Sequence, residues 1–165
     1  MFRDMRRIKQ LMSDSDTKAV LERGTSGVLA VSGDDDYPYA VPVSYVFAGG
    51  KLYFHGAPAG HKIDSIKRNC KVSFCVIDKD TIVPEKFTTF FRSVIAFGKI
   101  HIIEDSAEKR QALERIADRY SPHASPDARE KELKSALPRV CMLEMIIDHM
   151  TGKEAIELVR EKQNV

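Results

Sequence analysis

The chain has 165 residues and a hydrophobic content of 43%, which is typical of one domain with its own core. Its 26 lysine and arginine residues nearly balance 24 aspartate and glutamate residues, so the formal charge is only +2. The basic residues are also spread along the sequence, which argues against a nucleic-acid partner. Three cysteines lack CxxC spacing, and neither a signal peptide nor an apolar run of membrane-spanning length occurs. We therefore expect a single cytoplasmic domain over residues 1–165, without a metal site or a membrane partner.

The N-terminal part combines a short arm with a helix. Residues 1–12 are basic and amphipathic, and we expect them to form a flexible arm or to pack on a partner chain. Ser13 or Ser15 can cap a helix that runs through Leu21 to Arg23. Gly24 would end this helix in the left-handed conformation that glycine adopts readily.

The middle of the chain is rich in β-forming residues. The predicted strands are Ser26–Ser32, Tyr39–Phe47, Lys51–His55 and Lys71–Ile77. GDDD and AGG separate the first three runs, and a short helix over Gly60–Asn69 precedes the fourth. Two hairpins and a helix-covered return indicate an antiparallel sheet.

The C-terminal half predicts more strands and two covering helices. Thr88–Ile103 reads as one or two strands bent at Gly98, and Arg139–His149 reads as the last strand. Ser106–Arg119, with Ser106 as its N-cap, and Asp127–Ala136 read as helices that pack outside the sheet. About six antiparallel strands usually close into a barrel, which removes exposed edges. The expected fold is therefore mainly β (α+β), a six-stranded antiparallel barrel with peripheral helices.

A predicted phosphate site lies at the start of the short helix. Small residues from Gly56 and Ala57 to Gly60 lead into His61 and Lys62. The first amides of a helix have no internal acceptor, the helix dipole adds positive charge there, and Lys62 supplies a full charge. The other interpretation is that Lys62 belongs to the solvated face of a short helix, because no Walker or dinucleotide motif is present.

Pro42 stands in the middle of a predicted strand, where it removes a ladder hydrogen bond. That strand must therefore lie at an edge, or its backbone must face something other than another strand. A flat ligand lying along residues 41–44 would satisfy the second condition. Ser44 could bond such a ligand or only the local backbone.

His55 ends a strand just before the small-residue loop, so it would lie near the mouth of a site built there. A lone histidine at a strand end also commonly bonds a backbone carbonyl, and both interpretations stay open. Arg92 and Ser93 interrupt an apolar strand and must point to opposite faces, so that one of them points inward. No serine has the setting of a hydrolytic triad.

Four ordered blocks of sequence resemble the flavin-binding split β-barrels of the pyridoxamine 5'-phosphate oxidase superfamily, and within it the nitroimidazole-resistance (Nim) branch. The similarity extends from about Thr17 to Ile156. The blocks are YPYAVPVSYV, LYFHGAPAGHKIDSIKRNCKVSF, FFRSVIAFGKI with the following EDSAEKRQAL, and IDHMTGKEA.

The resemblance implies a homodimer that holds two FMN molecules at the subunit interface. Carried over by position, the cofactor-binding residues are Tyr39, Val41, Pro42, Val43, Ser44, Phe54, His55, Gly56, Ala57, His61, Lys62, Ser93, Thr151, Gly152 and Lys153. His61 and Lys62 would hold the phosphate, Phe54 and His55 would border the ring, and His55 would be the catalytic candidate on the substrate side.

The chain departs from the family where pyridoxamine oxidases have an arginine and a lysine at the phosphate. Here His61 precedes Lys62, which leaves one permanent cation. The expected function is an FMN-dependent oxidoreductase that passes electrons from a reduced nicotinamide or similar donor to a small organic acceptor, such as a nitro compound. The alternatives are a flavin-storage or sensor protein without turnover, and a barrel that binds haem or a deazaflavin.

Overall fold

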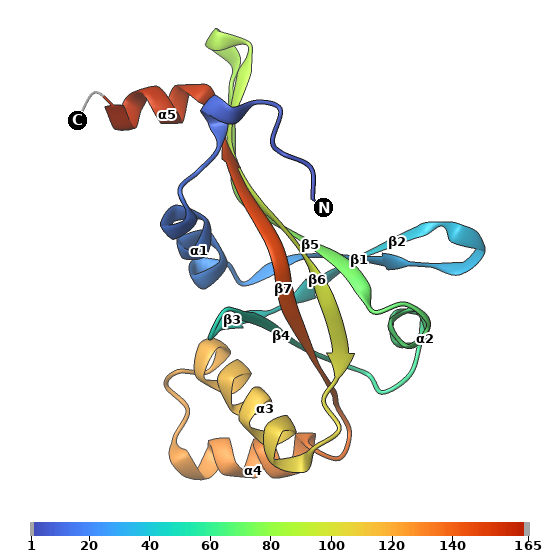
Figure 1. The fold of residues 1–165 in the computed structure, drawn as a ribbon. Coiled ribbons are helices and arrows are strands. Elements are labelled where there is room, and N and C mark those ends of the chain that lie inside the picture. The colour runs from blue at the N-terminus through green and yellow to red at the C-terminus, as the bar shows by residue number, and fades with distance from the viewer. Residues whose placement is uncertain (1, 164–165) are drawn as a thin grey trace.

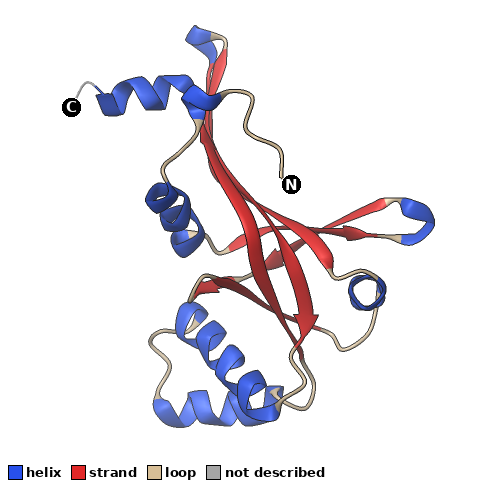
Figure 2. Cartoon of the chain, in the orientation of Figure 1, coloured by secondary structure: helices blue, strands red, loops and turns tan. Residues whose placement is uncertain are grey.

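In the computed structural model, residues 2–163 are described and form one antiparallel sheet with five α-helices (Figure 1). The strands are β1 (Ser26–Ser32), β2 (Pro38–Ser44), β3 (Val46–Ala48), β4 (Lys51–Gly56), β5 (Lys71–Val83), β6 (Thr88–Ile102) and β7 (Cys141–Glu154). The helices are α1 (Asp14–Arg23), α2 (His61–Arg68), α3 (Ser106–Tyr120), α4 (Pro126–Ala136) and α5 (Ile156–Gln163). Figure 2 shows a strongly curved sheet with the helices arranged around it.

The sheet has the strand order β2-β1-β5-β6-β7-β4-β3 and forms a split barrel, as predicted. Strands β2 and β3 are its two edges, so the barrel is open between them. Alternate side chains of the strands fill the interior, and Leu29, Phe54, Phe74 and Leu143 are almost completely buried there. This core fixes which face of each strand points outward.

The barrel has seven strands where six were predicted, because the predicted run Tyr39–Phe47 is broken at Tyr45. The Tyr45 amide leaves the ladder and donates to the carbonyl of Thr25 and to the hydroxyl of Tyr120. The Tyr45 side chain is fully buried in the core. A buried aromatic ring between β2 and β3 therefore divides one sequence run into two strands.

Helix α1 begins as predicted, because the Ser13 hydroxyl accepts a hydrogen bond from the Asp16 amide at 3.0 Å. Gly24 ends the helix, but the predicted left-handed conformation is wrong, since its φ of −65° and ψ of 150° are extended. A Cβ atom at Gly24 would collide with the Tyr45 hydroxyl. Glycine is required here by the close approach of a tyrosine rather than by backbone conformation.

Replacing Tyr45 by phenylalanine should lower the free energy of unfolding by about 1–2 kcal/mol. The Tyr45 hydroxyl donates to the carbonyl of Leu21 at 2.8 Å, and this carbonyl would lose its buried partner. Burial raises the pKa of Tyr45, so the hydroxyl stays protonated and remains a donor. Urea unfolding of the two proteins measures the difference. An unchanged midpoint would mean that this bond contributes no net stability.

Helices α3 and α4 form a second apolar cluster against the outer side of β3 and β4. Tyr53 and Met142 contribute from the sheet, and Leu113, Ile116 and Leu133 contribute from the helices. The predicted N-cap Ser106 is wrong by one residue. Asp105 caps α3 instead, because its carboxylate accepts hydrogen bonds from two amides of the first turn, each at 2.9 Å. An ionised carboxylate is a stronger acceptor than a hydroxyl at this position.

Strands β5 and β6 are longer than the barrel needs and continue as a two-stranded ribbon (Figure 1). Strand β5 was predicted to end at Ile77, but it passes through an irregularity between Ile77 and Lys79 and reaches Val83. The irregularity breaks the alternation of side chains, so the sequence pattern ends there. The predicted bend at Gly98 is confirmed, since the β6–β7 register shifts between Phe97 and Gly98 within one continuous strand.

The N-terminal segment lies along the far end of β7, which continues past the predicted limit of His149 to Glu154. The Met12 amide donates to the Gly152 carbonyl at 3.0 Å, and Phe2 stacks on His149 with 4.8 Å between ring centroids. The N-terminal segment is thus attached to its own sheet. No helix within residues 2–163 is long and apolar enough to span a bilayer.

Candidate functional site

The start of α2 lies at one end of the barrel, next to the end of β4. Gly60 precedes the helix with φ of 124°, which only glycine adopts without strain. Its carbonyl accepts from the amides of Ile63 and Asp64. The amides of the preceding residues in this first turn lack intrahelical acceptors and are therefore available to an anion.

His61 is held against the β1–β2 hairpin. Its imidazole stacks on the Tyr39 ring with 4.2 Å between centroids, and its Nε2 lies 3.6 Å from an Asp34 carboxylate oxygen. Arg68, at the other end of α2, donates to the Ser32 and Gly33 carbonyls and to Asp34. Asp34 therefore competes with any bound anion for His61, which strengthens the importance of the neighbouring lysine.

Lys62 extends over Gly56. A Cβ atom at Gly56 would lie 3.1 Å from the Lys62 Nζ, so the absence of a side chain makes room for the ammonium group. Within residues 2–163, Lys62 forms no ion pair. Tyr39, Gly56, His61 and Lys62 thus form one group, here called the α2 cluster, with Ala57 exposed in the adjoining loop.

Strand β2 borders the α2 cluster and is an edge of the sheet, which confirms the first of the two conditions set by Pro42. Pro42 and Ser44 point outward, whereas Tyr39, Val41 and Val43 pack against the core. One side of the β2 backbone pairs with β1, so its other side is open to a ligand. An edge position alone is sufficient to explain the proline.

Phe54 and His55 point in opposite directions from β4. Phe54 is fully buried, and its ring packs edge-on against Phe74 at 5.2 Å, so its side chain belongs to the barrel core. Only the Phe54 backbone can reach a ligand, because the barrel core takes its side chain. His55 is exposed and lines a cavity with α3 and α4, on the opposite face of β4 from the core.

The four remaining predicted residues lie together on the last two strands. Ser93 pairs directly with Lys153, and Thr151 pairs with Ile95. Gly152 is buried, since a Cβ atom there would collide with Thr17. Ser93, Thr151, Gly152 and Lys153 are here called the β6–β7 group.

Within one chain, the β6–β7 group lies far from the α2 cluster. Along one row of the sheet, Pro42 pairs with Val28, Val28 with Cys75, Cys75 with Ile95 and Ile95 with Thr151. Four strand spacings separate Pro42 from Thr151, which is about 19 Å along the sheet. Figure 1 also shows α2 far from the end of β7 that leads into α5.

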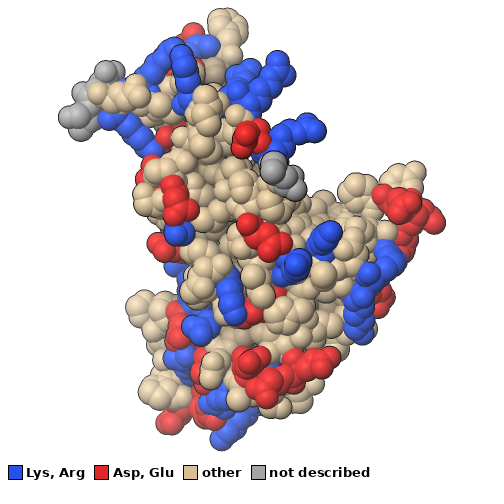
Figure 3. Space-filling model, viewed as in Figure 1, with Lys and Arg blue, Asp and Glu red and all other residues tan. Residues whose placement is uncertain are grey.

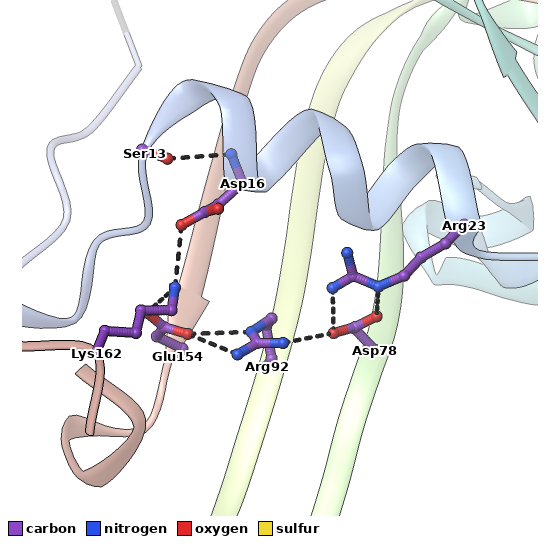
Figure 4. A network of polar contacts seen from close by, with 7 residues as sticks. All are labelled: Ser13, Asp16, Arg23, Asp78, Arg92, Glu154 and Lys162. Carbon is purple, nitrogen blue, oxygen red and sulfur yellow. Dashed lines mark hydrogen bonds and ion pairs between the residues drawn. The ribbon is translucent and has the colours of Figure 1, made fainter. Parts of the chain in front are cut away.

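A charged network that the sequence did not reveal lies directly behind the β6–β7 group (Figure 4). Arg92 donates to Glu154 at 3.0 Å and to Asp78 at 3.2 Å, and the Glu154 side chain is only 4% exposed. The network is completed by Arg23, which binds Asp78, and by Lys162, which binds both Glu154 and Asp16. Because neighbours alternate along a strand, Arg92 and Glu154 point away from Ser93 and Lys153.

The ion pairs of the network shift the pKa values of some of its own members. The Arg23 guanidinium holds the pKa of Asp78 below its ordinary value, and Glu154 raises the pKa of Lys162. Asp78 and Lys162 therefore stay charged at neutral pH. Three cations and three anions balance, so the network is a structural support for strands β5 to β7 rather than a site that attracts ions.

The described residues form no metal cluster, and two of the three thiols are buried enough to react poorly. Residues 2–163 contain no cluster of three histidine, cysteine, aspartate or glutamate side chains suited to a metal. Burial raises the pKa of Cys75 and of Cys141, which makes both thiols poor nucleophiles at neutral pH. Figure 3 shows positive and negative side chains mixed on the visible face.

Comparisons with known proteins agree with this fold. The chain is similar to a candidate 5-nitroimidazole antibiotic resistance protein from Bacteroides thetaiotaomicron, with 25% identity, 87% of this chain and 86% of that chain covered, and a TM-score of 0.72. It is also similar to an FAD-binding protein from Mesorhizobium loti, with 25% identity, 88% and 97% covered, and a TM-score of 0.62.

Sequence comparison gives a shorter match and a family. An uncharacterized protein from Rhizobium meliloti is 36% identical over 69 residues, which are 42% of this chain and only 44% of that protein. The model of the pyridoxamine 5'-phosphate oxidase family matches residues 13–154, which include every strand of the split barrel, the α2 cluster and the β6–β7 group. The chain therefore belongs to the pyridoxamine 5'-phosphate oxidase family.

Proposed function

We propose that the protein binds FMN and passes electrons from a reduced nicotinamide or a similar donor to a small organic acceptor, such as a nitro compound. The observation that carries this proposal is the α2 cluster, where Lys62, unpaired within residues 2–163, lies over Gly56 beside unpaired helix amides. This chemistry suits a phosphate monoester. The FAD-binding relative and the family support a flavin as the group attached to that phosphate.

The residues of the α2 cluster and β2 fit two portions of FMN, its phosphate and its ribityl chain with the ring. Lys62 and the first amides of α2 would hold the phosphate, and the open backbone edge of β2 would lie along the ribityl chain and ring. A bound flavin supplies hydride acceptance and electron transfer, whereas the protein supplies position and charge. Because His55 lies on the face of β4 opposite the α2 cluster, we do not propose it as the group that provides a proton to the acceptor.

We further propose a homodimer, because the outer face of the sheet is apolar and is only partly covered by Phe2, whose ring stacks on Phe97 at 5.4 Å. This outer face is the side of β1, β5 and β6 opposite the core. It exposes Val28 by 37%, Ile77 by 68%, Ile95 by 41% and Phe97 by 38%. Contiguous exposed side chains of this kind mark an interaction surface. A second copy would bury them and could bring its β6–β7 group to the α2 cluster of the first chain.

The β5–β6 ribbon supports the same arrangement. It extends beyond β7, which ends opposite Arg92, so no third strand supports the ribbon past that point. Its tip exposes Ile82 by 73% and Phe87 by 99%, and Phe87 has a left-handed φ of 49°. Two-stranded ribbons are marginal in water, and a bulky residue in this conformation is uncommon. Contact with a second copy would stabilise such a tip.

Replacing Ile95 by glutamate should convert the dimer to a monomer, because two glutamates would be placed in an apolar interface. Light scattering coupled to size-exclusion chromatography measures the mass. Ile146→Glu is the matched control, since Ile146 is similarly exposed, at 45%, but pairs with Lys51 and Lys99. A monomeric wild-type protein, or an Ile95 variant that remains dimeric, would contradict the proposed interface.

The cofactor and the reaction are tested by absorbance. We expect the purified protein, after incubation with FMN, to show the bands of a bound oxidised flavin. Under anaerobic conditions NADH or NADPH should bleach these bands, and a nitroaromatic acceptor should restore them. Bound flavin that neither nicotinamide reduces would favour storage or sensing instead of turnover. Failure to retain FMN would contradict the proposal as a whole.

A further inference from the structure

A cavity of about 310 Å³ lies between α3, α4 and the end of β4, outside the barrel. Its walls are the inner faces of the two helices, where Leu113, Ile116 and Leu133 are buried. Alanine residues leave the space that larger side chains would fill, namely Ala117, Ala128 and Ala136. This cavity is distinct from the α2 cluster, because β4 separates them: Lys62 covers Gly56 from the core side, whereas the cavity lies on the other side.

His55 places a polar group at this apolar cavity. Within residues 2–163, its imidazole has no hydrogen bond or ion pair. A neutral imidazole offers one donor and one acceptor, and either can bind a ligand that enters the cavity. A mostly apolar pocket with a few placed polar groups is the common form of a small-molecule site.

The charges at the cavity exclude a strongly ionic ligand. Its charged lining residues are Arg129 and Glu132, which have opposite signs. Arg129 is already engaged by Asp118 at 2.6 Å and by the Glu114 carbonyl at 3.3 Å. A charged ligand would lose its hydration without gaining a fixed counter-charge.

We propose that this cavity binds a small, uncharged aromatic molecule that forms a hydrogen bond with His55. An apolar cavity of about 150 Å³ is sufficient to bind benzene. The present cavity is about twice as large, so a fused two-ring compound or a substituted single ring fits it. Binding of this molecule does not require a flavin, which separates the proposal from the function proposed above.

The direct test is a titration of the full-length protein with indole, followed by methyl NMR of labelled leucine, valine and isoleucine. We expect the resonances of Leu113, Ile116, Leu133 and Val140, which line the cavity, to shift with a common dissociation constant. Leu21 and Leu29, which are buried in the barrel core, should not shift. The titration is repeated with FMN present, and we expect the same result. Uniform small shifts, or none at millimolar indole, would overturn the proposal.

Two variants test the geometry. Ala117→Leu fills the cavity and should weaken indole binding at least tenfold, whereas Ala107→Leu, at an exposed position of the same helix, should leave it unchanged. His55→Phe should weaken indole by about three- to tenfold, the effect of one neutral hydrogen bond. Indene has the same shape as indole but no N–H group, so His55→Phe should not weaken the binding of indene. If His55→Phe weakens indole and indene equally, His55 does not bond the ligand. If Ala117→Leu binds indole as well as the wild type does, the ligand does not occupy this cavity.

Discussion

Replacing Lys62 by alanine should weaken FMN binding about ten- to hundredfold and leave riboflavin binding nearly unchanged. Only FMN carries the phosphate, and a hydrogen bond to a charged group contributes about 1.5–3 kcal/mol. The neighbouring His61 offers limited compensation, because its imidazole stacks on Tyr39 and faces Asp34. Quenching of flavin fluorescence on binding measures both dissociation constants.

Lys67→Ala is the matched control for this experiment. Lys67 carries the same charge on the same helix, but it lies in the last turn of α2 and is exposed. The loss should be confined to Lys62, because α2 directs its free amides to the ligand only at its first turn. If both variants lose the same affinity, the effect is a general one of net charge. If Lys62→Ala weakens FMN and riboflavin equally, Lys62 does not contact the phosphate.

Replacing Arg92 by methionine should lower the free energy of unfolding by about 3 kcal/mol, because the buried Glu154 carboxylate would lose one of its two cations. For a domain of this size the corresponding decrease in Tm is about 6–12 °C. Arg110→Met is the matched control. Arg110 also binds two carboxylates, of Glu114 and Glu130, but its side chain is 37% exposed. An exposed pair of this kind contributes about 1 kcal/mol or less.

The double variant Arg92→Met, Glu154→Met separates loss of an ion pair from loss of packing. Removing both charges leaves no unpaired buried carboxylate, so the double variant should be more stable than Arg92→Met alone. Urea unfolding of the four proteins of this cycle gives the coupling free energy. A double variant that loses the sum of the two single effects would show that Arg92 and Glu154 act independently.

The network should also make the free energy of unfolding depend on pH in the acid range. The pKa values of Asp78 and Asp16 are lowered, chiefly by hydrogen bonds from Arg23 and Lys162 respectively. A lowered pKa in the folded state stabilises the protein above the unfolded value, near 3.9, and this contribution is lost as the pH falls through the folded value. The difference between the wild type and Arg92→Met should therefore narrow below about pH 4.

Local sequence patterns were sufficient to predict those elements whose structure depends on residues close together in the sequence. Strand β1 has the predicted bounds, Ser26–Ser32, because alternation of apolar side chains reports a half-buried strand directly. Helix α2 begins at His61, directly after the glycine that allows the turn. Pro42 left two conditions open for its strand, and β2 meets the first of them, because it is an edge of the sheet.

Contacts between distant segments decided the rest. The break at Tyr45 depends on Tyr120, and the network joins Arg23 to Asp78 across 55 positions of the chain. The burial of Phe54 and the outward position of His55 follow from which face of β4 the barrel encloses. The sequence by itself determined most of the strands along the chain, the two conditions on the Pro42 strand and the glycine-led helix start at His61. Only the tertiary structure decided that Lys62 and His55 lie on opposite faces of β4, and that four strand spacings, about 19 Å along the sheet, separate Pro42 from Thr151. Such positions depend on register and closure between strands far apart in the chain.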